Sequence, residues 1–287
     1  MTYEELWHRL TSTYDAGEAK AIVRWVLEVR FGLSLADILC GKVTQLSADD
    51  QTELGKIMHR LEKGEPVQYI IGVADFCGRQ FHVEPGVLIP RPETAELCEW
   101  IIKSEEREVG SHKCHVLDIG TGSGCIAITL ALDMPDSQVT SWDISETALC
   151  VARKNAQTLG ADITLEKQNA LGISRPSYCS PHTFKWDLIV SNPPYITLPE
   201  RDGMEKNVLD YEPEEALFAP KDDSIIFYRR IADYASWALK PEGRLYFELN
   251  PLTAEAVRSY LEEAGFSDIE IYNDQFGKHR FLKAKKR

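Results

Sequence analysis

The sequence predicts an α/β protein: a doubly wound, mostly parallel sheet of seven strands, preceded by a small all-helical domain. Two changes of pattern along the 287 residues support this prediction. Residues 1–72 have only helical periodicity, residues 73–92 resemble a hairpin and a linker, and residues 93–287 alternate strand-like and helix-like segments. Strands that alternate with helices of this length pair in parallel and carry helices on both faces of the sheet.

The helical domain has four expected helices. The apolar spacing predicts helices over 3–14, 19–31 and 34–39, and Ser47 is the expected N-cap of a fourth that stops near Gly64. This domain has no glycine loop, acid pair or nucleophile. Its expected role is therefore to recognise a partner or cover a site, and the alternative is packing alone.

The remaining elements follow from short apolar runs and turn signals. Residues 71–83 alternate around a two-residue turn at 77–78, which predicts a hairpin, and the stiff I-P-R-P-E-T segment (89–94) leads into a helix over 95–104. Residues 174–182 resemble a surface loop. The further predicted strands are 115–119, 138–142, 163–167, 187–191, 244–249, about 268–272 and 280–283; the helices are 125–134, 146–159, 225–239 and 254–264.

A glycine-rich turn joins the first of these strands to its helix. Glycines let the backbone turn tightly and approach a ligand, and the helix N-terminus behind them favours negative charge. Asp143 ends the next strand, where a carboxylate can accept two hydrogen bonds from a ribose diol. The alternative is that Asp143 only caps the following helix. The turn consists of Gly120, Thr121, Gly122, Ser123 and Gly124.

The acid before this turn indicates which cofactor it holds. The turn does not match G-x-G-x-x-G, and Asp118 stands just before it. A carboxylate there repels a pyrophosphate but can accept from an ammonium group. This favours S-adenosylmethionine over NAD or FAD. The chain also lacks the G-x-x-x-x-G-K-[ST] loop that would hold ATP.

The N-P-P-Y motif directly follows a predicted buried strand. Asn192 offers a side-chain carbonyl, Pro193 and Pro194 hold the backbone extended, and Tyr195 supplies a face for stacking. These features suit the binding of a flat group that carries an NH2. That group could belong to an amide or to a nucleobase.

Composition and charge limit the class of protein. The chain is 44% hydrophobic and 27% charged, as expected of a soluble globular protein, and its net charge of −13 argues against a stable nucleic-acid partner. It has no apolar run of membrane-spanning length and no signal-peptide pattern at its start. These two features predict a cytoplasmic location. The seven cysteines lack C-x-x-C spacing and the histidines form no close pair, so we expect no metal site.

With these residues, the chain resembles the HemK/PrmC family. Members are S-adenosylmethionine-dependent methyltransferases that modify the glutamine amide nitrogen in the GGQ loop of class 1 peptide release factors. The N-P-P-Y motif is shared with enzymes that methylate nucleobase amines, whereas I-P-R-P-E-T behind a helical N-terminal domain is far more specific. The resemblance implies a class I methyltransferase fold and a release-factor partner, and we expect a monomer. It rests on residues 64–70, 81–83, 88–94, 117–124, 143–145, 190–196, 211–213 and 227–231.

Carried over to this sequence, the resemblance gives roles to the motif residues. The glycine turn and Asp143 hold the cofactor, and Asn192 lies between the cofactor and the substrate amide. Asn169 and Ala170 stand where the family usually has an Asp followed by an aromatic; Asn169 can still hydrogen-bond the adenine, but Ala170 offers no stacking face. Other departures are Ala95, the turn at 221–223, and a missing glycine at 247–251.

The expected chemistry needs two acceptors. We expect the Asn192 side-chain carbonyl and the Pro193 main-chain carbonyl to accept the two amide hydrogens, with Pro194 completing the pocket and Tyr195 packed against the flat amide. The sequence has no strong candidate for a general base. Two other functions stay open at this point: a methyltransferase acting on a nucleobase amine of DNA or RNA, and a cofactor-binding adaptor without turnover.

Overall fold

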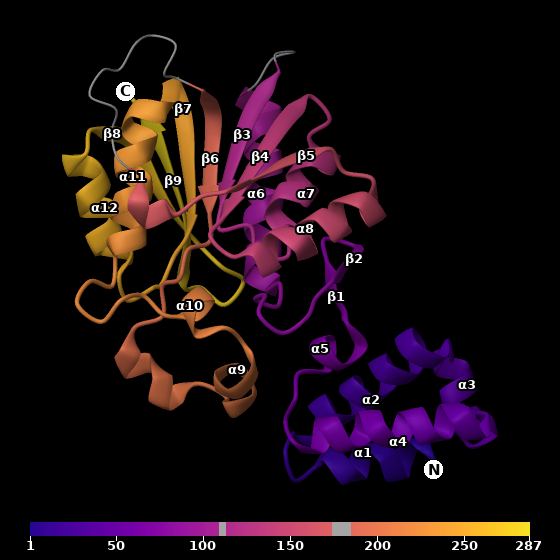
Figure 1. Ribbon diagram of the computed structural model, residues 1–287. Helices are drawn as coiled ribbons and strands as arrows, with labels where there is room; N and C mark the ends of the chain where they lie inside the picture. The colour runs from indigo at the N-terminus through magenta and orange to yellow at the C-terminus, as the bar shows by residue number, and fades with distance from the viewer. Residues whose placement is uncertain (109–112, 174–184) are drawn as a thin grey trace. The chain divides into compact units, whose positions relative to one another are not determined.

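The computed structural model describes residues 1–108, 113–173 and 185–287 (Figure 1). The described chain forms two compact units. One consists of Met1–Val73 with Met204–Tyr211, and the other of Ala74–Gly203 with Glu212–Arg287. The surface loop expected over 174–182 lies outside the described residues. No helix in the described parts of the chain is both long and apolar enough to cross a membrane.

Capping side chains set the helix ends in the first unit. Asp15 accepts hydrogen bonds from two backbone amides, so the second helix begins at Ala16, earlier than its apolar spacing predicts. The first helix correspondingly ends at Leu10, and Ser47 caps the fourth as expected. The elements are α1 (Tyr3–Leu10), α2 (Ala16–Phe31), α3 (Leu35–Leu39), η1 (Lys42–Gln45), α4 (Ala48–Glu62) and α5 (Val67–Ile71).

A segment from late in the chain belongs to this first unit. It contains α9 (Lys206–Tyr211), and the hydroxyl of Tyr211 donates to the main-chain oxygen of Lys63 at 3.4 Å. Neither α5 nor α9 was predicted from the sequence. The division of the chain into domains at residues 72 and 92 stays a prediction.

The expected hairpin is present. β1 (Val73–Phe76) and β2 (Arg79–His82) are joined by Cys77 and Gly78, which both have positive φ, at 46° and 71°. Two left-handed residues make the turn type whose twist matches the strands it connects. After the hairpin, α6 (Pro92–Glu108) begins at a proline, which suits the first turn of a helix.

The second unit contains the predicted seven-stranded sheet. Its order is β5-β4-β3-β6-β7-β9-β8, and the pairs from β5 to β7 are parallel, whereas β9 is antiparallel to both of its neighbours. The fold class is therefore as expected. The strands are β3 (Cys114–Ile119), β4 (Ser137–Asp143), β5 (Ile163–Lys167), β6 (Trp186–Ser191), β7 (Leu239–Glu248), β8 (Phe266–Asn273) and β9 (His279–Lys286).

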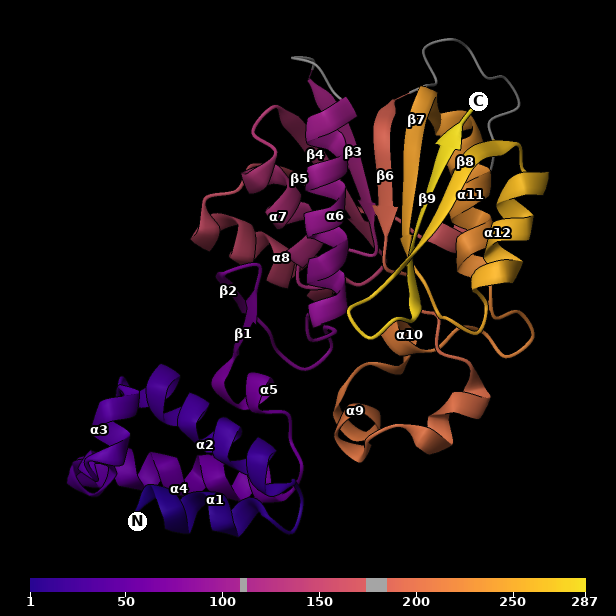
Figure 2. The same cartoon turned by 180° about the vertical axis from the view of Figure 1, so that it is seen from behind.

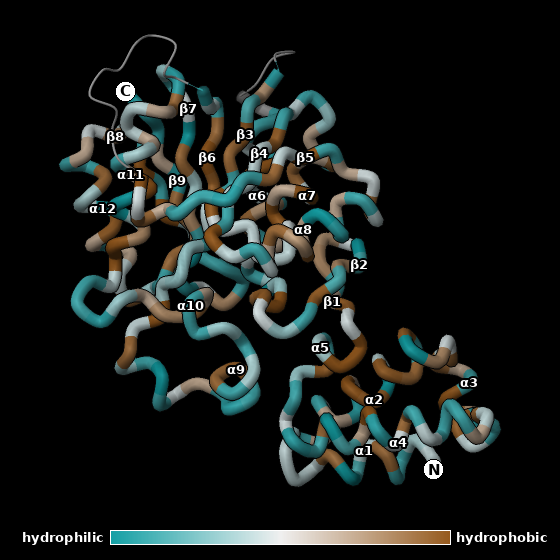
Figure 3. Tube along the Cα trace, in the orientation of Figure 1, coloured by the Kyte–Doolittle hydropathy of each residue, from teal (hydrophilic) through white to brown (hydrophobic). Residues whose placement is uncertain are grey.

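Helices cover both faces of this sheet (Figures 1 and 2). In β3, Leu117 and Ile119 pack in the core shared with α11 and α12, whereas Val116 packs in the core shared with α6 and α7. Figure 3 shows apolar residues along the central strands and more polar residues over the connections. The remaining elements are α7 (Cys125–Asp133), α8 (Glu146–Leu159), η2 (Ala170–Gly172), η4 (Leu198–Gly203), α10 (Glu214–Leu217), α11 (Ile226–Ala238) and α12 (Ala254–Glu263).

The start of β7 differs from the prediction. Leu239 was expected to end a helix, but it begins the strand and pairs with Trp186. The register then shifts, so that Arg244 is the next residue to pair, opposite Leu188. Glu242 has a φ of 66° in this irregular stretch. The sequence of this stretch resembles a turn, although it lies inside the strand. The predicted start of the strand, at residue 244, was therefore too late.

Gly124 is expected to be needed for close packing. It caps α7 with a φ of +83°, and an added Cβ would lie 2.9 Å from Cδ1 of Ile128 and 3.1 Å from Cβ of Ala152. Gly124→Ala should therefore combine backbone strain with overpacking and lower the free energy of unfolding by about 3 kcal/mol. Urea unfolding of the purified protein measures this.

Gly160 provides the matched control. It has a similar φ of +75°, but nothing lies within 4 Å of an added Cβ. Gly160→Ala should therefore introduce backbone strain alone and lower the free energy of unfolding by about 1 kcal/mol. Equal losses in the two variants would show that the close contacts with Ile128 and Ala152 contribute nothing.

Candidate active site

All the candidate residues lie at one edge of the sheet. Because β3 to β6 run parallel, their carboxyl ends meet at the same edge, where ligands of such sheets bind. Residues 118–124 close β3, Asp143 ends β4, Asn169 and Ala170 follow β5, and the N-P-P-Y motif (192–195) follows β6. The fold thus gathers four separate sequence motifs in one place.

The glycine loop (residues 120–124) is bound to the end of β4. The amides of Gly120 and Thr121 donate to the main-chain oxygen of Trp142 at 2.8 and 2.9 Å. The amide of Gly122 donates to Oδ2 of Asp143 at 2.9 Å. Both Gly120 and Gly122 have positive φ, which lets the loop turn this sharply. The loop is therefore held in shape by β4.

Asp143 is not the cap of the following helix. The N-cap of α8 is Ser145, whose side chain accepts from the amide of Ala148. Asp143 instead accepts from Gly122 through Oδ2 and from the amide of Ser145 through Oδ1, at 2.8 Å. Each carboxylate oxygen can accept a second hydrogen bond. One acceptor position on each oxygen thus remains for a diol.

Several polar atoms beneath the loop have no partner. Oδ2 of Asp118 accepts from the hydroxyl of Ser141 at 2.7 Å, but Oδ1 is buried without a hydrogen bond. The hydroxyls of Thr121 and Ser123 are also buried and unpartnered. Buried polar groups in native proteins are almost always paired. Orphaned groups at a glycine loop fit a polar ligand bound against it.

Burial changes the protonation of Asp118. Burial, together with the nearby charge of Asp143, raises the pKa of this carboxyl from 3.8 to about 7, although the Ser141 hydrogen bond acts in the opposite direction. Between pH 4 and 7 the folded state thus binds more protons than the unfolded state, so this group makes the protein less stable as pH rises.

Asp118→Asn should therefore show a pH-dependent gain in stability. The variant cannot ionise, so its melting temperature relative to the native protein should be higher at pH 8 than at pH 5. Differential scanning fluorimetry without cofactor measures this. The same difference at both pH values would contradict the buried-charge explanation.

The N-P-P-Y motif is held next to the glycine loop. The hydroxyl of Ser191 donates to the main-chain oxygen of Ile119 at 2.6 Å, which ties the ends of β6 and β3 together. A Cβ added at Gly120 would lie 3.8 Å from the main-chain oxygen of Asn192. The glycine loop and the N-P-P-Y motif are therefore neighbours, as a transfer reaction between ligands bound to them would require.

Asn192 presents a free carbonyl. Its side-chain NH2 donates to Oγ1 of Thr94 at 3.1 Å. No described residue donates to its Oδ1 or to the main-chain carbonyl of Pro193. Tyr195 packs against the core, its hydroxyl donates to Oε1 of Glu248 at 2.9 Å, and burial raises its pKa well above the usual range. Tyr195 therefore stays protonated and is no base.

Comparison with known proteins identifies the family. Residues 5–72 match the PrmC N-terminal domain, and residues 102–208 match the methyltransferase small domain. The chain is 47% identical over 278 residues to the release factor glutamine methyltransferase of Bacteroides thetaiotaomicron, covering 96% of this chain and 95% of that protein. The chain belongs to the release factor glutamine methyltransferase family. The resemblance found in the sequence is thus confirmed.

Two further relatives support this placement. The release factor glutamine methyltransferase of Flavobacterium psychrophilum is 37% identical over 274 residues, covering 96% of this chain and 94% of its own. The crystal structure of a methyltransferase from Pyrococcus furiosus matches with a TM-score of 0.50 at 17% identity, and the match covers 84% of this chain and 99% of that chain. The latter supports the fold alone.

In this family member, the two residues after β5 make contacts within the chain. Oδ1 of Asn169 accepts from the amide of Leu171 at 2.9 Å and so caps η2. Its side chain is exposed, and its NH2 has no hydrogen-bond partner among the described residues. Ala170 packs against the core on the α11 side. Of this pair, Asn169 alone keeps a free polar group.

Other site residues were missed in the sequence. Thr94 on α6 and Glu248 at the end of β7 contact the N-P-P-Y motif, and Asn155 on α8 donates to the main-chain oxygen of Ser123 at 2.8 Å. Glu212, with its side chain buried, pairs with Arg91 of the I-P-R-P-E-T segment. A polar residue on an otherwise apolar helix face was the available signal for Asn155.

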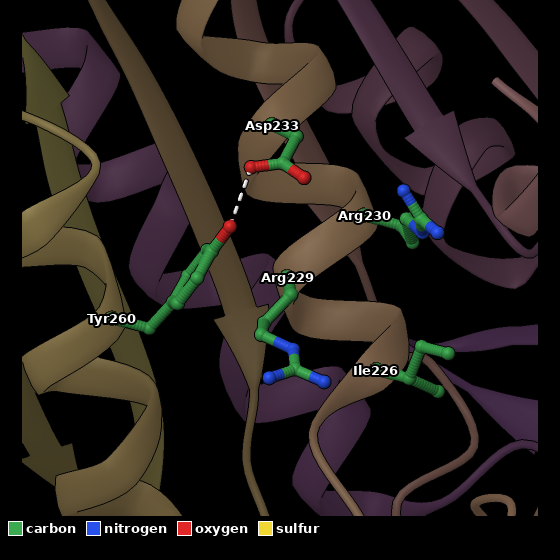
Figure 4. A pocket seen from close by; sticks show the side chains of 5 residues that line it. All are labelled: Ile226, Arg229, Arg230, Asp233 and Tyr260. Carbon is green, nitrogen blue, oxygen red and sulfur yellow. Dashed lines mark hydrogen bonds between the residues drawn. The ribbon is translucent and has the colours of Figure 1, made fainter. Parts of the chain in front are cut away.

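A surface pocket on the second unit is separate from this site (Figure 4). It lies between α11 and α12, and in it the hydroxyl of Tyr260 donates to Oδ1 of Asp233 at 2.6 Å. It contains two arginines, of which Arg229 pairs with Asp223. It shares no residue with the glycine loop or the N-P-P-Y motif.

Proposed function

We propose that this protein transfers a methyl group from S-adenosylmethionine to the side-chain amide nitrogen (N5) of the glutamine in the GGQ loop of peptide chain release factors. The observation that carries this proposal is the unpartnered side-chain carbonyl of Asn192, a residue whose main-chain oxygen lies beside the glycine loop. The 47% identity to a release factor glutamine methyltransferase supports the choice of substrate.

The residues at the carboxyl edge fit the cofactor. S-adenosylmethionine supplies, when bound, an electrophilic methyl group on a positively charged sulfur. The open acceptor positions of Asp143 suit the ribose diol, and the backbone of residues 120–124 suits close approach. The ionised carboxylate of Asp118 would attract the cofactor's ammonium group from beneath the loop. The NH2 of Asn169 remains for an adenine nitrogen.

The N-P-P-Y motif would orient the substrate amide. An amide nitrogen is a weak nucleophile, because its lone pair is delocalised into the carbonyl. Oδ1 of Asn192 and the carbonyl of Pro193 accept its two hydrogens, which fixes the plane of the NH2 and stabilises the positive charge that develops on it. Pro194 and the ring of Tyr195 form the wall of the pocket. The proton can leave after transfer, so no base is required.

We also propose that the enzyme acts as a monomer in the cytoplasm. Class 1 release factors are partners in translation, which supports the cytoplasmic location. Nucleic acid is not expected as a stable partner, because the net charge is −13. Light scattering of the purified protein tests the monomer directly.

Radiolabelled methyl transfer tests the substrate. The protein is incubated with labelled S-adenosylmethionine and either a release factor, the same factor with its GGQ glutamine replaced by glutamate, or bulk nucleic acid. Label should enter the unaltered factor alone. Label in nucleic acid instead would favour a nucleobase methyltransferase, and cofactor binding without any transfer would favour an adaptor.

A further inference from the structure

We propose that Glu248, acting through the hydroxyl of Thr94, fixes the direction in which Asn192 points its side-chain amide. Both residues are thus positioning residues for the methyl transfer. This inference rests on the proposed function, because it concerns how the substrate acceptor is aimed.

The three side chains form a continuous chain of hydrogen bonds. The NH2 of Asn192 donates to Oγ1 of Thr94 at 3.1 Å, and the hydroxyl of Thr94 donates to Oε2 of Glu248 at 2.6 Å. Thr94 and Glu248 are 3% and 1% exposed. Water therefore has little access to replace either partner.

The direction of each hydrogen bond in this series follows from the number of hydrogens available. An ionised carboxylate only accepts hydrogen bonds, so the single hydroxyl hydrogen of Thr94 must go to Glu248. The oxygen of Thr94 can then only accept from Asn192. The NH2 of Asn192 is consequently turned toward Thr94, and Oδ1 is turned away from it. Oδ1 is the atom proposed to accept the hydrogen of the substrate amide.

Glu248 holds the other end of the motif as well. Its second oxygen, Oε1, accepts from the hydroxyl of Tyr195 at 2.9 Å. One buried carboxylate thus anchors both the first and the last residue of N-P-P-Y. The main-chain oxygen of Glu248 accepts from the hydroxyl of Tyr228 at 3.0 Å, which fixes the end of β7 itself.

Burial opposes the charged form of Glu248, and its polar neighbours offset part of that effect. Burial raises the pKa of Glu248, and the nearby charge of Glu93 adds to the rise. The hydrogen bonds from Thr94 and Tyr195 and the positive charge of Arg280 act in the opposite direction. Both oxygens of Glu248 accept a hydrogen bond from a hydroxyl group, which is the arrangement of an ionised carboxylate.

Substitutions at Thr94 test the inference. Thr94→Val keeps the shape of the side chain and removes the hydroxyl, so Asn192 loses the acceptor that orients it. We expect kcat on a release factor to fall by about tenfold to a hundredfold, with an unchanged Kd for S-adenosylmethionine. Thr94→Ser keeps the hydroxyl and should restore most of the turnover that Thr94→Val loses.

Glu248→Gln provides a second variant of nearly unchanged volume. Its amide can donate to Thr94, which lets Thr94 donate to Asn192 and turns the carbonyl of Asn192 inward. We expect a similar loss of kcat. Because the two residues act as one unit, the double variant T94V/E248Q should lose little more than either single variant. If one variant fails to fold, as judged by its melting temperature, the other carries the test.

The outcomes separate this inference from the proposed function. Full turnover in folded Thr94→Val, or equal losses in Thr94→Val and Thr94→Ser, would overturn the positioning role while leaving release-factor methylation intact. Additive losses in the double variant would also overturn it. Absence of transfer by the unaltered protein would instead contradict the proposed function.

Discussion

Replacing Asn192 with alanine is expected to lower turnover on a release factor by about a hundredfold or more. The substitution removes one of the two acceptors that orient the substrate amide and stabilise its developing charge. The Kd for S-adenosylmethionine should change much less, because the proposed cofactor contacts lie mainly on the glycine loop and Asp143. Steady-state kinetics and calorimetry measure the two quantities separately.

Asn273→Ala is the matched control for this experiment. Asn273 is exposed at the end of β8, where Oδ1 contacts Nδ1 of His279, and it is no part of the proposed site. Its removal should leave turnover unchanged. Unchanged turnover in Asn192→Ala as well would rule out the proposed role of the N-P-P-Y motif.

Asp143→Ala is expected to weaken cofactor binding by about a hundredfold. The variant loses two charge-assisted acceptors for the ribose diol, each contributing about 1–2 kcal/mol. It also releases the amide of Gly122, which Asp143 holds at 2.9 Å, so the glycine loop loses an anchor. Isothermal titration calorimetry with S-adenosylmethionine measures the change in Kd.

The control for Asp143 is Glu146, three residues along the chain. Its side chain is exposed and pairs with the exposed Lys167 at 3.0 Å. A surface ion pair of this kind contributes little, so Glu146→Ala should bind the cofactor almost normally. An equal Kd in the two variants would mean that Asp143 serves only to hold the loop and Ser145.

Much of the catalytic unit could be predicted because its signals are local. The glycine loop and the N-P-P-Y motif are each contiguous in the sequence, and parallel strands place their carboxyl ends together. The sheet was predicted for the same reason, since each strand has its own apolar run. Where the chain departs from a local rule, as in the stretch after Leu239, the prediction was wrong.

The positioning residues could not be predicted, because their partners are far apart in the chain. Thr94 and Glu248 are separated by 154 residues, and neither has a neighbouring residue that indicates the other. Asp143 was ambiguous for a different reason. A carboxylate before a helix can serve as a cap, and only the structure shows that Ser145 occupies that position.

Tandem mass spectrometry of a release factor incubated with the protein and S-adenosylmethionine tests the central claim most directly. The expected result is a gain of about 14 Da on the glutamine of the GGQ loop, the mass of one added methyl group. Asn192→Ala should produce little of it in the same time. An unmodified GGQ glutamine after incubation with the active, cofactor-bound protein, or a methyl group on any other residue, would contradict the claim.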